Sequence, residues 1–426
     1  MKTFATQRVA IRILWVFALG VLGFVVYAWR STLPPVDPPS AGSFTVETIQ
    51  RGAQLAALGD CATCHTTPGG DTFAGGRPLL TPFGTIYSTN ITPDISSGIG
   101  HWSQAAFQRA LREGVNREGE HLYPAFPYDH FTLLTDADCA ALYAFIMTRQ
   151  PIQAKVPEND LPFPLNMRLI LAGWKLLFLH EGPYEPDPKH DEQWNRGAYL
   201  ANGIGHCGAC HTPRNSFGAQ IRTQHFGGGE AEGWHAYAIN SGSQSHEAWT
   251  AAAMHAFLRT GWHEQHGDAH GPMAPVTQNL ALVADSDVLA IAAYVAAVIG
   301  KPGQQQPNKA VSAEKDKPNN DTGAQIYAYA CASCHDGTRP LPFGGVKLTL
   351  STAVSGETAT NLINVILQGI QPPEGTAGAI MPGFSSALTD GQVESLLAYI
   401  RSNFSTRPPW TNLESSVREA RSRNSD

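Results

Sequence analysis

Residues 51–65 read RGAQLAALGDCATCH, and the last five letters decide how the rest of the chain is interpreted. The pattern returns at 196–211 as RGAYLANGIGHCGACH and at 322–335 as TGAQIYAYACASCH. Each stretch has Gly-Ala eight to ten residues before the first cysteine, which predicts a short helix running into a cysteine loop. The three pairs use six of the seven cysteines: Cys61, Cys64, Cys207, Cys210, Cys331 and Cys334.

C-x-x-C-H is the attachment signature of heme c, because two thiols bond the vinyl groups and the histidine binds the iron from below. The sequence therefore predicts three covalently bound heme c groups with His65, His211 and His335 as iron ligands. A zinc ribbon would place two pairs close together, and a thioredoxin-like site would need a βαβ pattern, which we do not find. The seventh cysteine, Cys139, is expected to be a small buried apolar residue.

Each motif is followed by a helical pattern with an acidic first turn, at a distance that suits one small domain. The three patterns lie at residues 134–148, 283–298 and 388–402. A first helix packed on a last helix with a heme between them is the plan of cytochrome c. We therefore predict a mainly α fold with an N-terminal transmembrane helix and three tandem cytochrome c domains. The cofactor supplies core that a domain of this size lacks.

Composition and linker patterns divide the chain into seven segments. They are an anchor and spacer (1–43), cytochrome c domain 1 (44–155), an apolar linker (156–189), domain 2 (190–300), a flexible linker (301–320), domain 3 (321–405) and a polar tail (406–426). The apolar linker is either a helix that lies on a membrane or partner surface, or a bridge buried between heme domains. We expect the tail to be disordered.

An uncharged apolar run, Ile13–Trp29, follows three basic residues, Lys2, Arg8 and Arg12. We interpret it as a single uncleaved anchor in the inner membrane rather than a cleaved signal peptide, because no small-x-small cleavage site follows. Basic residues stay on the cytoplasmic side, so the heme domains are predicted to face the periplasm. The formal net charge is −7 without a long basic run, which gives no indication of nucleic-acid binding.

A cytochrome that only transfers electrons usually fills the sixth iron position, often with methionine. Met381 precedes Tyr399 of the last helical pattern, and Met273 precedes Tyr294 at a similar distance. We predict both methionines as sixth ligands.

In the first domain Phe145 matches those tyrosines, and Phe126, which cannot ligate, takes the methionine place. His130 is the preferred sixth ligand, because it follows a Pro-Tyr turn. His121, Met147 and an open or water-bound iron are the alternatives. A second histidine would give this heme a lower potential than its Met-ligated neighbours.

The chain resembles the triheme cytochrome c subunits of bacterial membrane-bound periplasmic dehydrogenases. The matching stretches are GGRPLLTPFGTIYSTNITPD (75–94), GIGHW (98–102), LYPAFPY (122–128), CHTPRN (210–215), GPMAPV (271–276) and IMPGF (380–384). The stretch at 225–249 departs from the sequence pattern of the family, so the resemblance defines the heme contacts of the second domain less well.

The resemblance implies electron transfer from a catalytic dehydrogenase subunit of molybdopterin, PQQ or flavin type to membrane ubiquinone, and a small iron–sulfur subunit can accompany such complexes. Some members have methionine where this chain has Phe126, and many have a cleaved signal in place of the anchor. Both departures favour the molybdopterin aldehyde dehydrogenase type.

We find no dinucleotide loop, iron–sulfur cysteine set or nucleophile elbow, so no catalytic site of the chain's own is expected. Two alternatives are open. One is a multiheme peroxidase or reductase with an open first heme, and the other is a stand-alone carrier to a terminal oxidase.

Overall fold

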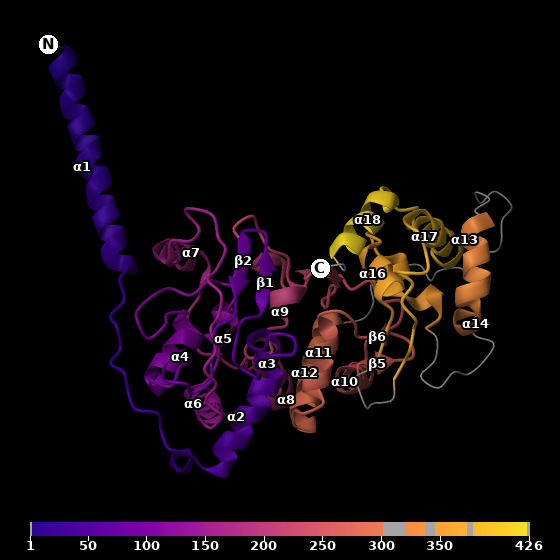
Figure 1. The fold of residues 1–426 in the computed structure, drawn as a ribbon, viewed down its shortest axis with the longest axis horizontal. Helices are drawn as coiled ribbons and strands as arrows, with labels where there is room; N and C mark the ends of the chain where they lie inside the picture. The colour runs from indigo at the N-terminus through magenta and orange to yellow at the C-terminus, as the bar shows by residue number, and fades with distance from the viewer. Residues whose placement is uncertain (1, 301–320, 337–345, 373–377, 424–426) are drawn as a thin grey trace. The chain divides into compact units, whose positions relative to one another are not determined.

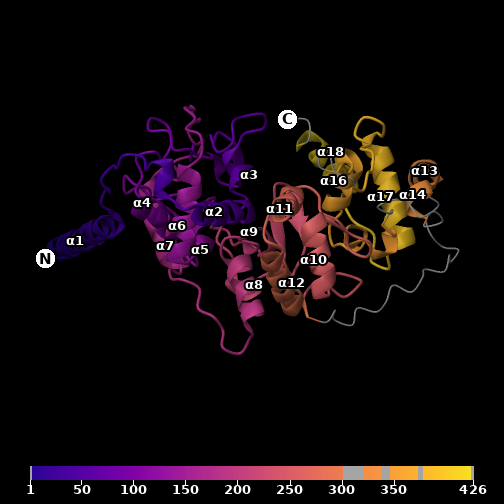
Figure 2. The same ribbon diagram turned by 90° about the horizontal axis from the view of Figure 1, so that it is seen from below.

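The computed structural model describes residues 2–300, 321–336, 346–372 and 378–423 (Figures 1 and 2). The chain divides into two compact units, Met1–Glu185 and Pro186–Asp426. The described parts are mainly helical, as predicted, with three short antiparallel hairpins. Division into seven segments stays a prediction, and the linker at 301–320 lies outside the described residues.

The first unit is built from helices and one hairpin. They are α1 (Lys2–Ala28), α2 (Val46–Leu58), α3 (Cys61–His65), β1 (Pro78–Thr81), β2 (Gly84–Tyr87), α4 (Gln104–Glu113), α5 (Tyr128–Phe131), α6 (Asp136–Met147) and α7 (Leu171–Phe178).

The second unit repeats this order and then starts it again. Its elements are α8 (Glu192–Asn202), α9 (Gly208–His211), β3 (Gly229–Ala231), β4 (Trp234–Ala236), α10 (Ala251–Thr260), β5 (Trp262–His263), β6 (Gly267–Asp268), α11 (Met273–Leu280), α12 (Asp285–Ile299), α13 (Asp321–Ile326), α14 (Ala332–His335), α15 (Thr352–Ser355), α16 (Thr360–Gln368), α17 (Asp390–Phe404) and α18 (Leu413–Arg423).

Three helix pairs form the frame: α2 with α6, α8 with α12, and α13 with α17. A glycine sits at each crossing, because a side chain would collide with the partner's backbone. A Cβ would lie 2.0 Å from the Ala141 carbonyl oxygen at Gly52, 2.0 Å from that of Ala290 at Gly197, and 2.2 Å from that of Ser395 at Gly323. These three glycines let the helices approach within backbone contact.

The same crossings align the aromatic residues of the last helices. The Cβ atoms of Phe145, Tyr294 and Tyr399 each lie 2.7–2.9 Å from the Cβ position of the crossing glycine. The predicted correspondence of these three residues is therefore confirmed. It fixes the register in which the methionine positions of the three repeats are compared.

Local sequence explains where the last helices begin. The Thr135 side chain accepts a hydrogen bond from the Asp138 amide at the start of α6, and Thr389 forms a capping box with Gln392 at the start of α17. Asp138 also pairs with Arg51 of α2 at 3.1 Å, which ties the helix start to the crossing. An equivalent pair, Arg196 with Asp287 at 2.8 Å, ties α8 to α12.

The prediction that the tail is disordered is wrong for 413–423, which form α18. Leu413, Val417 and Ala420 lie on one helical face and are at most 7 % exposed, packed on the core of the third repeat. Arg421 of this helix bonds Asp390 at 2.8 Å. The high charge of the tail hid a narrow apolar stripe at helical spacing.

The helix α1 contains Ile11–Ala28, which is long and apolar enough to cross a membrane by length and composition. The spacer that follows it is held along the first unit. The Leu33 amide donates to the Arg117 carbonyl at 2.8 Å, and the Val36 amide donates to that of His101 at 3.1 Å. The spacer after α1 is therefore hydrogen-bonded to the first repeat.

In the third repeat a matched pair of substitutions tests the crossing. Gly323→Ala would push Cβ into the Ser395 carbonyl, whereas Gly391→Ala on α17 meets no atom within 4 Å. We expect Gly323→Ala to lower the free energy of unfolding by about 1–3 kcal/mol, and Gly391→Ala to leave it unchanged or raise it by less than about 1 kcal/mol. Chemical denaturation followed by Soret absorbance measures both, and equal effects would contradict the close crossing.

Candidate heme-binding sites

Each motif histidine is held by one backbone carbonyl. The Nδ1 atom of His65 lies 2.7 Å from the Thr89 oxygen, that of His211 lies 2.7 Å from Tyr237, and that of His335 lies 3.0 Å from Val346. A carbonyl only accepts, so Nδ1 carries the proton and Nε2 keeps its lone pair. All three rings are thus in the tautomer that binds a metal through Nε2.

In the described part of the chain no three His, Cys, Asp or Glu side chains are grouped to hold a metal ion, which fits heme c rather than a zinc or iron–sulfur site. Burial lowers the pKa of His65 and of His211, so both imidazoles are neutral ligands. Burial raises the pKa of Cys61 and of Cys207 to about 12. Burial disfavours the thiolate, and these surroundings suit the neutral sulfur of a thioether.

The second repeat reproduces the heme loop of the first. The hydroxyls of Thr66 and Thr212, which follow the motif histidines, accept from the amides of Phe73 and Phe226 at 3.2 and 3.1 Å. Both phenylalanines take a positive φ, 66° and 59°. Such a backbone is costly for a bulky residue, so its recurrence indicates the same constraint in both loops.

The divergent stretch at 225–249 keeps this geometry. The Gly228 amide donates to the His211 carbonyl at 2.9 Å, as the Gly75 amide donates to that of His65 at 2.8 Å. The Phe226 ring also meets Tyr294 edge-on, as Phe73 meets Phe145. The different sequence of this stretch therefore changes side chains but preserves the loop that holds His211.

Two asparagines of α16 hold the hairpin that leads to Tyr237. Asn361 accepts from the His235 amide and donates to the His235 carbonyl, both at 2.8 Å. Asn364 donates to the Gly233 carbonyl at 3.0 Å. The third repeat thus braces the segment whose carbonyl orients His211.

Met273 and Phe126 occupy corresponding turns, whereas Met381 lies in a different setting, a backbone bridge. Met273 is the first residue of α11, and Met381 pairs with Ile370 in an isolated bridge. Phe126 takes the place of Met273: the Leu122 amide donates to Gly114 and the Ala269 amide to Gly261, both at 2.7 Å, four residues earlier. Ligation itself stays a prediction.

The first repeat's three candidate ligands lie in different surroundings. His130 is 6 % exposed on α5, and Met147 is 5 % exposed at the end of α6. Both ring nitrogens of His121 are engaged, with the Ala28 carbonyl at 2.8 Å and the Lys175 amine at 3.0 Å. His121 therefore joins the first repeat to α1, and His130 stays the predicted sixth ligand. Cys139 is fully buried, as predicted.

Sequence reasoning missed the carbonyls of Thr89, Tyr237 and Val346, because a backbone oxygen carries no residue-type signature. It also missed Thr66 and Thr212. A signal for these two existed, since threonine directly follows the motif histidine in both repeats.

This fold and these sites define a multiheme c-type cytochrome. Residues 49–150 match the family described as cytochrome c, and residues 318–400 match cytochrome C oxidase, cbb3-type, subunit III.

Similar proteins cover the remaining part as well. The chain is 44 % identical over 408 residues to a nicotinate dehydrogenase subunit of Pseudomonas putida, covering 95 % of this chain and 34 % of that protein. It is 36 % identical over 399 residues to the fructose dehydrogenase cytochrome subunit of Gluconobacter japonicus, covering 87 % and 82 %. A diheme cytochrome c-type protein of Cereibacter sphaeroides is 35 % identical, covering 65 % and 95 %.

The chain belongs to the family of cytochrome c subunits of dehydrogenases, which includes those for fructose, gluconate and alcohol. Its class of function is electron transfer, in agreement with the predicted family. The chain spans about a third of the length of the nicotinate dehydrogenase subunit and most of the fructose dehydrogenase subunit.

The brace on the second repeat can be tested by substitution in α16. Asn361→Ala removes two hydrogen bonds to the backbone of the hairpin, and Asn364→Ala removes one. At about 1 kcal/mol for each bond, Asn361→Ala should lower the free energy of unfolding about twice as much as Asn364→Ala does. Calorimetry should also show the second and third repeats melting in separate steps for Asn361→Ala. Equal, negligible losses in both variants would show that the asparagines do not brace the hairpin.

Proposed function

We propose that the chain is the three-heme electron-transfer subunit of a dehydrogenase complex, with three tandem cytochrome c domains. The observation that carries the proposal is the threefold recurrence of a C-x-x-C-H histidine whose Nδ1 is bound to a backbone carbonyl. The second repeat lies outside both matched family ranges, and its support is the loop geometry it shares with the first.

Heme c alternates between ferric and ferrous iron and so holds one electron. The cysteine pairs would hold each group covalently, and His65, His211 and His335 would bind iron through Nε2. Met273, Met381 and His130 would occupy the opposite positions. A protein ligand on each side of the iron would leave little to rearrange when the charge on the iron changes.

The anchor and the linker support a membrane location. α1 would cross the inner membrane, with the repeats on the periplasmic side. α7 contacts α1 in the first unit, and Leu176 and Leu177 on α7 are 64 % and 67 % exposed. Two apolar side chains beside an anchor favour the membrane-surface role of α7 over a buried bridge.

Electrons would pass from a catalytic subunit to ubiquinone. The family resemblance supports an aldehyde or alcohol dehydrogenase, of molybdopterin, PQQ or flavin type, with a small iron–sulfur subunit as a further candidate. Similarity to the nicotinate dehydrogenase protein of Pseudomonas putida adds a heteroaromatic acid such as nicotinate to the candidate substrates.

Purification in mild detergent tests this assignment. We expect the chain to be isolated with a catalytic subunit and its molybdenum, quinone or flavin cofactor, and the complex to reduce ubiquinone-1 when given substrate. A chain that is always isolated alone and delivers electrons only to an oxidase would support the stand-alone carrier instead.

The number of hemes can be counted by intact-protein mass spectrometry. We expect three covalent hemes in the natural chain and two after the double substitution Cys331→Ser and Cys334→Ser. Cys139→Ala is the matched control, because Cys139 is buried outside the three motifs and its loss should leave three. A natural chain with two hemes would contradict the proposal.

The sixth ligand of the first heme can be tested by potentiometric titration. His130→Met exchanges imidazole for thioether and should raise one of three midpoint potentials, on the order of 0.1 V. Met147→Leu serves as the control and should leave all three unchanged. If Met147→Leu moves a potential and His130→Met does not, the assignment to His130 is wrong.

A further inference from the structure

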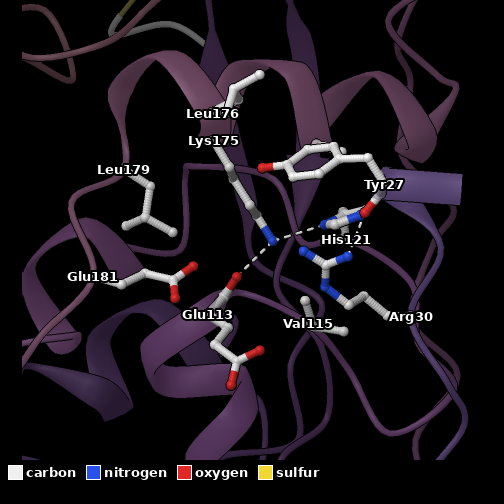
Figure 3. A pocket seen from close by; sticks show the side chains of 10 residues that line it. Tyr27, Arg30, Glu113, Val115, His121, Lys175, Leu176, Leu179 and Glu181 are labelled. Atoms are coloured by element: carbon white, nitrogen blue, oxygen red, sulfur yellow. Dashed lines mark hydrogen bonds between the residues drawn. The ribbon is translucent and has the colours of Figure 1, made fainter. Parts of the chain in front are cut away.

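A cavity of about 210 Å³ lies where α1 meets the first repeat (Figure 3). Its walls come from the last turn of α1, Arg30 two residues beyond it, the end of α4, the 115–121 segment, α7 and the residues just after α7. The residues that matter below are Tyr27, Arg30, Glu113, Lys175, Leu179 and Glu181. Its volume is below the ~300–1,000 Å³ of drug-sized sites and suits a single substituted ring.

The floor of the cavity is a closed hydrogen-bond network. The Lys175 amine donates to the carbonyls of Glu113 and Gly114, both at 2.6 Å, and to Nδ1 of His121 at 3.0 Å. These bonds satisfy the C-terminal carbonyls of α4, so the burial of the Lys175 amine needs no ligand to explain it. Burial lowers the pKa of Lys175 to about 7, so its positive charge is weak at neutral pH.

Three other polar groups belong to lining residues, and the two carboxylates among them interact electrostatically with Lys175. In the part of the chain that the structure describes, the Tyr27 hydroxyl and the carboxylates of Glu113 and Glu181 make no hydrogen bond or salt bridge. Figure 3 shows the Tyr27 hydroxyl, the Arg30 guanidinium and the Glu181 carboxylate directed toward the same space. Hydrogen-bond donors and acceptors therefore converge there.

The charges favour a neutral ligand. Arg30 and the weakly charged Lys175 share the cavity with the Glu181 carboxylate, so a phosphate group would meet repulsion from Glu181. A quinone ring accepts hydrogen bonds from Tyr27 and Arg30, and its quinol form donates to a carboxylate. Both redox forms therefore find complementary groups.

Two lining residues belong to apolar segments. Tyr27 ends the apolar stretch of α1, and Leu176, also in the lining, is 64 % exposed on α7. With α1 in a bilayer, as proposed above, a ring could enter here while its isoprenoid tail stays among the lipid chains. We infer that this cavity binds the headgroup of the membrane quinone that the proposed electron-transfer role requires.

The site adjoins the segment that distinguishes the first repeat. The Lys175 amine lies over the Tyr128 ring at 4.9 Å, and Tyr128 packs edge-on against Trp174 of α7. Tyr128 stands between Phe126 and His130 in the chain. The residues proposed to face the first heme are thus in contact, through Tyr128, with the floor of the quinone cavity.

The test is binding of ubiquinone-1 to the oxidised, detergent-solubilised chain with its co-purified subunits, measured by titration calorimetry. Leu179→Trp fills the cavity and should weaken binding at least about tenfold. Tyr27→Phe removes one donor and should weaken it about fivefold. Leu177→Trp adds the same ring on exposed α7 outside the lining and should leave affinity within about twofold.

Binding that is equal in the natural chain, Leu179→Trp and Tyr27→Phe would overturn the assignment. So would displacement of ubiquinone-1 by phosphatidylglycerol, which would identify the cavity as a lipid site. If the natural complex reduces ubiquinone-1 and Leu179→Trp does so at the same rate, the electron-transfer role stands and this cavity is not its quinone site. A different result is a natural complex that binds ubiquinone-1 without reducing it, with binding lost only in Leu179→Trp and Tyr27→Phe. That result would show that ubiquinone is not the electron acceptor, and it would support the cavity as a quinone-binding site.

Discussion

The hydrogen bond from Nδ1 of each motif histidine to a backbone carbonyl is the constraint on which the structure depends. One such bond contributes only about 1 kcal/mol net. It nevertheless selects the tautomer and the ring orientation, so that Nε2 of His65, His211 and His335 is available to iron. The surrounding elements position the three carbonyls that accept these bonds. The crossing glycines fix the helix pairs, and the loop after each motif carries the carbonyl back to the motif histidine.

The repeats are specialised around this shared arrangement. The second is braced by α16 of the third through Asn361, which stabilises the segment that orients His211. The first is joined to α1 through His121 and Lys175, and its distal turn carries Phe126 in place of methionine. The repeat with phenylalanine in place of methionine is therefore the one that is joined to the candidate membrane helix.

Much of this could be predicted from sequence, because covalent attachment fixes residue types and spacing. The three motifs, the helix pairs and the correspondence of Phe145, Tyr294 and Tyr399 follow from spacing alone. The carbonyl partners could not be predicted, since any residue supplies a carbonyl. α18 was missed because its charge outweighs a three-residue apolar stripe, and the role of His121 was missed because its partners, Ala28 and Lys175, are distant in the chain.

Low-temperature electron paramagnetic resonance of the oxidised natural protein tests the central claim most directly. If every iron is closed by two protein ligands, all three hemes should give low-spin signals, one of them of the bis-histidine kind. A high-spin signal from one heme in three, together with rapid carbon monoxide binding after reduction, would contradict the relay and identify the first heme as an open, reactive iron.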